Sequence, residues 1–237
     1  MSNLPLAELA ALGAAICWTF TAILAAPGVH HFGAVAFNRY RVVFAATVLI
    51  VITSVMGLWS SMTDNAVIAL IGSSLVGIVV GDTALMQALK RIGPRRNSVL
   101  FATSAPMAAG MGFLWLGETL STNLLIGCGL ILAGVVNAVW WGRKASGEHR
   151  LEKISGHLGL GILLGLTAAF GQAAGAVMAK PVLLAGADPI AASAIRVGFA
   201  AVVLLLVRLL PFAWAKANAK PTVTFVLRTM SSATLGL

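Results

Sequence analysis

Charged residues are scarce in this sequence of 237 residues. They make up 10% of it, and seven of them are acidic. An ordinary soluble domain has about 25% charged and about 45–50% apolar residues, whereas 59% of this sequence is hydrophobic and its mean hydropathy is +0.96. The few charges do not suffice to cover a surface that faces water, which excludes a soluble globular enzyme. The same hydrophobicity excludes a disordered chain, because disordered segments are poor in apolar residues.

Residues and motifs of the common catalytic and metal sites are also missing. Cys17 and Cys128 lie inside apolar stretches without CxxC spacing, so zinc and disulfide frameworks have no support. The sequence lacks a GxSxG nucleophile elbow, a P-loop and an HExxH motif. Within the apolar stretches there is one aspartate, whereas an intramembrane aspartyl protease needs two. We therefore expect a protein that is not an enzyme and has no cofactor and no metal site.

The sequence is rich in long apolar stretches. A membrane-spanning helix needs about 20 such residues, and seven stretches reach that length. One contains Asp82, and one contains Arg196 and, near its end, Arg208. In chain order the stretches cover residues 9–29, 42–63, 65–89, 97–117, 119–142, 158–179 and 189–210. We expect an all-α polytopic membrane protein with seven full transmembrane helices and a partial eighth that begins near Thr222.

The net charge of +9 is concentrated in alternate connections between these stretches. Lysine and arginine gather around residues 39–41, 90–96, 143–153 and 208–220, whereas the other ends carry Lys180 alone. The positive-inside rule places the basic connections in the cytoplasm and the N-terminus outside. The expected partners are the lipid bilayer and a small-molecule solute, with no nucleic acid and with a homo-oligomer left open. The expected location is the cell membrane, as the inner membrane of a bacterium or archaeon.

A segment that begins at Arg41 recurs 155 residues later at Arg196. Seven of ten positions are identical between RVVFAATVLI and RVGFAAVVLL, and upstream matches such as Pro27 with Pro181 keep an offset of 154. Because five helices precede the second copy, it begins on the opposite side of the membrane. The pattern therefore predicts a five-helix inverted-topology repeat, which in secondary transporters places the binding site between the repeats near the midplane.

The repeat divides the chain into a first five-helix unit at residues 1–142, a cytoplasmic linker at 143–156 and an incomplete second unit at 157–237. A complete second unit would end at about residue 297, about 60 residues beyond Leu237. We therefore expect a truncated form of a ten-helix protein that does not transport by itself. The alternative is a short membrane protein that pairs with another chain.

Motifs in several of the stretches form a specific combination when they are taken in order. They are Trp18, Arg41, Ser104-Ala105-Pro106, Gly117-Glu118 and the glycine-rich segment GCGLILAG at residues 127–134. With this set the sequence resembles the EamA family of the drug/metabolite transporter superfamily, over a full unit at 9–142 and an incomplete one at 157–237. The resemblance implies ten helices in two units and the movement of small metabolites, usually outward. The family is usually drawn with the N-terminus inside, whereas the charges here argue for outside.

Asp82 is the main candidate for chemistry. It lies eight residues before Lys90, which on a helix is about 12 Å further into the membrane. A carboxylate there costs roughly 2.5–3.5 kcal/mol and normally faces a cavity or a partner. Two interpretations stay open, a proton carrier that couples transport and a structural ion pair with Arg41 or Arg39.

Four further residues are candidates for substrate binding. Arg41 and Arg196 are repeat-related cations, and either can bind a substrate carboxylate through two hydrogen bonds. Arg41 can instead anchor the helix at the cytoplasmic edge. Because inverted symmetry places the two arginines near opposite faces, we do not expect them to hold one ligand together. Trp18 and Gln172 occupy equivalent mid-helix positions, where each can line a cavity or pack against a neighbouring helix.

The remaining candidates concern helix shape and the family motif. Pro106 removes a backbone hydrogen bond and predicts a kink in its helix. Gly117 and Glu118 form the motif at the outer end of that helix, where a structural role is favoured for Glu118. Together the patterns predict a secondary transporter that exports small metabolites, with proton coupling through Asp82. The alternative is a non-transporting remnant or a membrane interaction module.

Overall fold

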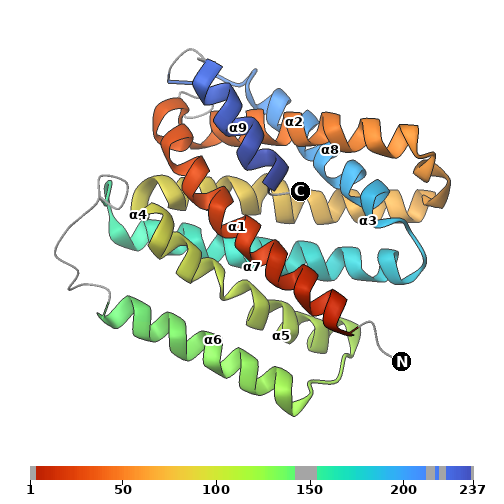
Figure 1. The fold of residues 1–237 in the computed structure, drawn as a ribbon, viewed down its shortest axis with the longest axis horizontal. Helices are drawn as coiled ribbons and strands as arrows, with labels where there is room; N and C mark the ends of the chain where they lie inside the picture. The colour runs from red at the N-terminus through yellow and green to blue at the C-terminus, as the bar shows by residue number, and fades with distance from the viewer. Residues whose placement is uncertain (1–3, 142–153, 212–216, 219–222, 236–237) are drawn as a thin grey trace.

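The computed structural model describes residues 4–141, 154–211, 217–218 and 223–235, and all regular structure in these ranges is helical (Figure 1). The prediction of an all-α fold is therefore confirmed. In chain order the elements are α1 (Leu4–Phe32), α2 (Ala34–Val55), the short 3₁₀-helix η1 (Leu58–Ser61), α3 (Asp64–Ser74), the π-helix η2 (Leu75–Asp82), α4 (Thr83–Phe101), α5 (Ser104–Leu116), α6 (Thr122–Trp141), α7 (Leu158–Leu184), α8 (Pro189–Val207) and α9 (Val223–Leu235).

By length and composition, five helical stretches among the described residues can cross a membrane. They are Leu12–Phe32, Ala34–Val55, Asp64–Phe101, Leu158–Leu184 and Pro189–Val207. A shorter apolar helix covers Thr122–Ala138. Large apolar side chains such as Leu114 and Leu184 lie on the outside of the bundle with three quarters or more of their surface exposed. That surface suits hydrocarbon rather than water, so the chain is a polytopic membrane protein.

The stretch Asp64–Phe101 is divided by a sharp bend at Gly93. This residue has a φ of +80°, a conformation that glycine adopts without steric cost. Pro94 follows it in the first turn of the next helical segment, where its missing N–H is not needed. The predicted boundary between the third and fourth spans therefore falls within the basic segment 90–96, where the charge pattern placed it.

Two predicted spans need correction. The second span was expected at 42–63, but α2 begins at Ala34 directly after Gly33 and ends at Val55. Arg39 and Arg41 therefore lie inside this helix and not in the connection before it. The prediction failed because a buried arginine can be stabilised by a partner that a count of charges does not reveal. The fourth span, expected at 97–117, is interrupted between Phe101 and Ser104 and consists of the end of α4 followed by α5.

The helix ends gather on two sides of the bundle (Figure 1). On the left in that view lie the junction of α1 and α2, the left-hand end of α4, the start of α7 and the end of α8. On the right lie the ends of α2, α5 and α7. The basic segment 90–96 of α4 and the end of α8, which is followed by Arg208, thus share one side. The side that faces the cytoplasm stays a prediction. The predicted linker at 143–156 falls mostly on residues 142–153, which lie outside the described residues.

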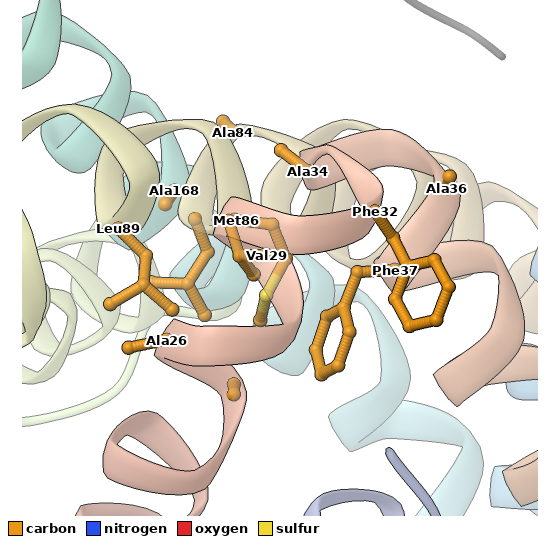
Figure 2. Packing of buried hydrophobic residues seen from close by; sticks show 12 residues of the cluster. Ala26, Val29, Phe32, Ala34, Ala36, Phe37, Ala84, Met86, Leu89 and Ala168 are labelled. Carbon is orange, nitrogen blue, oxygen red and sulfur yellow. The ribbon is translucent and has the colours of Figure 1, made fainter. Parts of the chain in front are cut away.

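α7 is the central helix of the bundle and packs against α3, η2, α4 and α5. One core cluster joins the end of α1, the start of α2 and the middle of α4, with Phe32, Phe37 and Leu89 almost completely buried (Figure 2). A second cluster joins α2 to α8, which run in opposite directions (Figure 1). α9 packs against α1 and α2. These contacts bring helices from both ends of the chain around one interior region.

Candidate functional site

A close contact between glycines fixes η2 against α7. A Cβ atom added to Gly171 would lie 2.8 Å from the Cα of Gly81, and one added to Gly175 would lie 2.9 Å from the Cα of Gly77. Real Cβ atoms are not found so close to backbone, so these positions accept no side chain. Small residues of this kind let membrane helices approach closely. The contact places the residue that ends η2, Asp82, beside the middle of α7.

Two serines before η2 tie the same region to α7 and α8. Ser73 Oγ donates a hydrogen bond of 2.6 Å to the carbonyl oxygen of Gly175. Ser74 Oγ donates to the carbonyl oxygen of Arg196. Both serines are completely buried. Eight residues of π-helix follow them, and π-helical turns occur frequently at functional sites.

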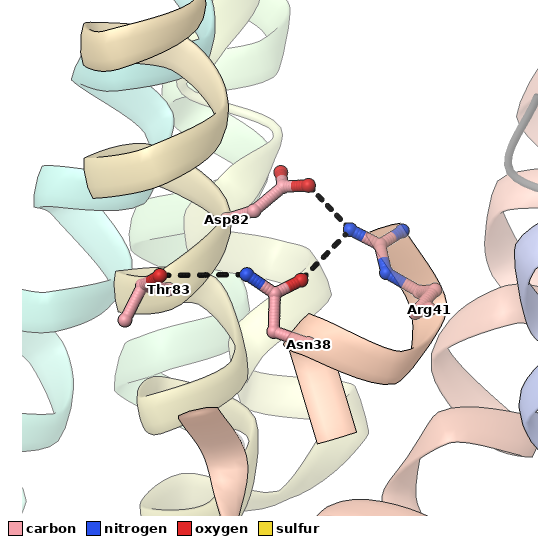
Figure 3. A network of polar contacts seen from close by, with 4 residues as sticks. All are labelled: Asn38, Arg41, Asp82 and Thr83. Atoms are coloured by element: carbon pink, nitrogen blue, oxygen red, sulfur yellow. Dashed lines mark hydrogen bonds and ion pairs between the residues drawn. The ribbon is translucent and has the colours of Figure 1, made fainter. Parts of the chain in front are cut away.

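Asp82 forms an ion pair with Arg41 of α2 (Figure 3). Arg41 Nη2 donates to Asp82 Oδ2 and also, at 3.3 Å, to Asn38 Oδ1. Asn38 Nδ2 in turn donates to Thr83 Oγ1 at 3.4 Å. The Arg41 and Asp82 side chains are 7% and 13% exposed, and Asn38 is fully buried. The network therefore connects α2 to η2 and α4 inside the bundle, and Arg41 is not an anchor at the membrane edge.

A cavity of about 150 Å³ adjoins this network. Its lining includes all five residues that the sequence singled out for binding or coupling: Trp18, Arg41, Asp82, Gln172 and Arg196. They come from α1, α2, η2, α7 and α8, and Ala233 adds α9. The tertiary structure thus brings the candidates together around one space.

Arg41 and Arg196, which we did not expect to hold one ligand together, both line the same cavity. Each is the eighth residue of its helix, which places it roughly 10 Å from the start of that helix. The two helices run in opposite directions (Figure 1), through a hydrocarbon core about 30 Å thick. The two long side chains therefore enter the bundle from antiparallel helices and line the same cavity.

The Arg196 guanidinium lies against the glycine contact. Its Nη2 would be 3.3 Å from a Cβ atom on either Gly77 or Gly175, so both glycines make room for it. Its Nε is buried, and no described residue accepts a hydrogen bond from the guanidinium group. It interacts with Asp82 through charge alone. Arg196 is therefore a cation inside the bundle whose donors remain available to the cavity.

Trp18 and Gln172 form part of the wall around these charges. The Trp18 ring stacks on Phe101, with 5.5 Å between the ring centres. Phe101 ends α4 immediately before the interruption that precedes Pro106. The side chain of Gln172 makes no hydrogen bond to another described residue. Both positions are compatible with contact to a ligand.

The other candidates lie outside the lining of the cavity. Pro106 is the third residue of α5, directly after the interruption between α4 and α5. Gly117 ends α5 in the left-handed conformation, with a φ of +66°. Glu118 follows it and forms an ion pair of 2.6 Å with Lys180 of α7, and both side chains are more than one third exposed.

Sequence reasoning missed Asn38, Thr83 and Ser74. A signal was available for Asn38, because it lies three residues before Arg41 and therefore on the same helix face. Thr83 and Ser74 gave no such signal, since their partners are distant in the sequence. Within the described ranges, no group of three or more histidine, cysteine, aspartate or glutamate residues could hold a metal ion.

Two comparisons with known proteins found similarity to membrane transporters. The model of the EamA-like transporter family matches residues 5–140, which is more than half of the chain. The chain is 25% identical over 147 residues to an uncharacterized transporter of Clostridium kluyveri, a match that covers 61% of this chain and 47% of that relative. The chain thus matches about half the length of this curated relative. No solved structure matches it.

The family match and the fold both indicate a membrane transporter protein. Transporters of this family are generally not enzymes. Apolar helices long enough to span the bilayer surround a charged interior in the described part of the chain. The chain is a multi-pass protein of the cell membrane, and it belongs to the EamA-like transporter family.

Proposed function

We propose that the chain forms the solute cavity of a secondary transporter that exports a small metabolite. The observation that carries the proposal is a charged cavity within a bundle of membrane-spanning helices. Charged side chains inside a membrane are costly, and those that occur there usually mark a pathway for a solute or an ion. Export is the direction that the family resemblance implies.

The cavity lies between helices from the two proposed units, 1–142 and 157–237. Residues of α1, α2 and η2 line it together with residues of α7, α8 and α9. In transporters with inverted repeats, rocking of one repeat against the other exposes such a site to each side in turn.

Asp82 is the proposed proton carrier. It is the one carboxylate among the described residues that line the cavity. Its negative charge holds Arg41, and through Arg41 it holds α2 against η2. Protonation removes that charge and weakens the connection, so the protonation state of Asp82 is linked to the packing of α2. Proton binding to Asp82 can therefore change the conformation of the bundle.

Flux through liposomes tests both parts of the proposal. The purified chain is reconstituted, and uptake of a panel of amino acids, small organic acids and amphipathic amines is measured with and without a pH gradient. Flux of at least one solute class that responds to the gradient supports the transporter, and it contradicts the expectation that this chain does not transport by itself. The Asp82→Asn variant should lose that response, whereas Asp64→Asn, at the exposed start of α3, should keep it.

Each negative result has a defined meaning. Gradient-dependent flux that persists in Asp82→Asn removes the coupling role from Asp82. Absence of flux for the whole panel, in protein that is folded and homogeneous, contradicts transport by this chain alone and leaves two readings: a truncated transporter that is inactive by itself, and a membrane interaction module that pairs with another chain.

A further inference from the structure

The cavity carries an excess of positive charge. The described residues of its lining contribute two guanidinium groups, from Arg41 and Arg196, and one carboxylate, from Asp82. Arg41 and Asp82 neutralise each other in their ion pair. The uncompensated charge therefore belongs to Arg196, whose guanidinium donates no hydrogen bond to a described residue.

Hydrogen-bond donors also outnumber acceptors in this cavity. A guanidinium group has five N–H donors and no acceptor. Trp18 adds an indole N–H, and Gln172 adds an amide group, and neither side chain is hydrogen bonded to another described residue. The one charged acceptor, Asp82, already accepts from Arg41. A ligand that complements this wall is rich in acceptors and carries negative charge.

The size of the cavity limits the ligand. Its volume is about 150 Å³, comparable to an engineered protein cavity that binds benzene, which has six non-hydrogen atoms. A solute of about this size fills the space.

We propose that the solute is a small monoanion of about six non-hydrogen atoms, whose carboxylate or similar oxyanion group is bound by Arg196. This inference rests on the proposed function and adds the substrate class. A monoanion brings the charge of the site from plus one to zero. A zwitterion leaves it at plus one, and an amine raises it to plus two, so both are disfavoured by the field of Arg196.

The same charges set the sign of proton coupling. A proton on Asp82 removes the one negative charge of the cavity and frees Arg41 to share the anion with Arg196. The anion and the proton therefore favour each other's binding, which is reciprocal by linkage. They move through the membrane in the same direction, and the net transfer carries no charge.

Titration calorimetry on the purified full chain in detergent tests the substrate class with four probes of nearly equal size. They are lactate as the anion, lactamide as the neutral amide, alanine as the zwitterion and 1-amino-2-propanol as the amine. We expect lactate to bind at least about tenfold more tightly than each of the others, in line with the strength of a charge-assisted bidentate contact. Equal binding of lactate and lactamide overturns the proposal.

Variants of Arg196 locate the binding group. Arg196→Gln should weaken lactate binding by about tenfold or more, and Arg196→Lys should keep part of it, because lysine retains the charge but not the planar fork. Arg208→Gln, in the exposed cap of the same helix, is the matched control and should bind lactate normally. Normal lactate binding by folded Arg196→Gln also overturns the proposal, and the four-probe comparison decides it where that variant does not fold.

Asp82→Asn gives a result that a merely structural role does not produce. Removal of the negative charge should tighten lactate binding by about tenfold, even though the variant is less stable. Weaker binding in folded Asp82→Asn contradicts the proposed sign of coupling.

Liposome flux then separates this inference from the proposed function. Flux of the amine or of lactamide in preference to lactate leaves transport standing and overturns the anion, whereas selective lactate binding without any flux overturns transport alone.

Discussion

Arg41 and Asp82 form an ion pair between α2 and η2, although 40 residues separate them in the sequence. Both side chains are shielded, and the Arg41 Nη2 that binds Asp82 also donates to the carboxamide oxygen of Asn38 (Figure 3). A carboxylate and a guanidinium that are costly alone inside the membrane thus compensate each other. The pair connects the stability of the bundle to the chemistry of the cavity.

Removal of one partner should destabilise the protein strongly. In Asp82→Asn the Arg41 guanidinium remains buried without its counter-charge, a change that typically costs about 3–5 kcal/mol. The measurement is thermal unfolding of the purified protein in detergent. The double variant Asp82→Asn with Arg41→Gln should recover part of the loss, because no uncompensated charge remains.

Asp64→Asn serves as the control for this experiment. Asp64 lies in the exposed first turn of α3, where an acidic residue contributes up to about 1 kcal/mol through the helix dipole. If Asp82→Asn unfolds at the same temperature as this control, the ion pair does not stabilise the bundle.

The glycine contact should be intolerant of a methyl group. In Gly171→Ala the new Cβ would meet the backbone of Gly81 at 2.8 Å and the carbonyl oxygen of Val76 at 2.9 Å. Because backbone cannot rotate away as a side chain does, α7 must shift, at a cost of about 1–3 kcal/mol. The same unfolding measurement should show the loss. Gly129→Ala, in α6 with nothing within 4 Å of its Cβ, should be neutral or gain up to about 1 kcal/mol from helix propensity. Equal stability of the two variants contradicts the close contact.

The ion pair between Glu118 and Lys180 should contribute little to stability. Both side chains are more than one third exposed, and such pairs typically contribute less than about 1 kcal/mol. We expect Lys180→Gln to unfold close to the unchanged protein, and Arg41→Gln to unfold at a clearly lower temperature. If Lys180→Gln lowers the unfolding temperature as much as Arg41→Gln does, burial does not determine how much an ion pair contributes to stability.

Reporter fusions test the orientation that the charge pattern predicts. A fusion at Ser61, at the end of η1, should report the outside of the cell. One at Ala145, outside the described residues, should report the cytoplasm, because positively charged connections are retained there. A cytoplasmic reporter at Ser61 reverses the orientation of the whole bundle.

Much of the fold could be predicted because hydrocarbon is a simple solvent. A segment that crosses it must be apolar and must satisfy its own backbone hydrogen bonds, so stretches of about 20 apolar residues predict helices directly. α7 and α8 begin at or next to their predicted starts, and α9 begins one residue after Thr222. One error arose at arginines, since Arg39 and Arg41 were counted as a connection although α2 includes them. The other was the fourth span, which is interrupted between Phe101 and Ser104 although its composition is continuously apolar.

The sequence by itself identified which residues do not suit a membrane interior: Asp82, Arg41, Arg196, Trp18 and Gln172 stand out in apolar stretches because of their own solvation cost or hydrogen-bonding groups. Their relationship to one another was decided by the tertiary structure. Antiparallel packing of α2 and α8 brought two arginines to one cavity, and the glycine contact of η2 with α7 brought Asp82 between them. Solvation acts on each segment separately and can be evaluated from composition. Which side chains contact one another depends on how helices that are distant in the sequence pack together. No local sequence pattern specifies that packing.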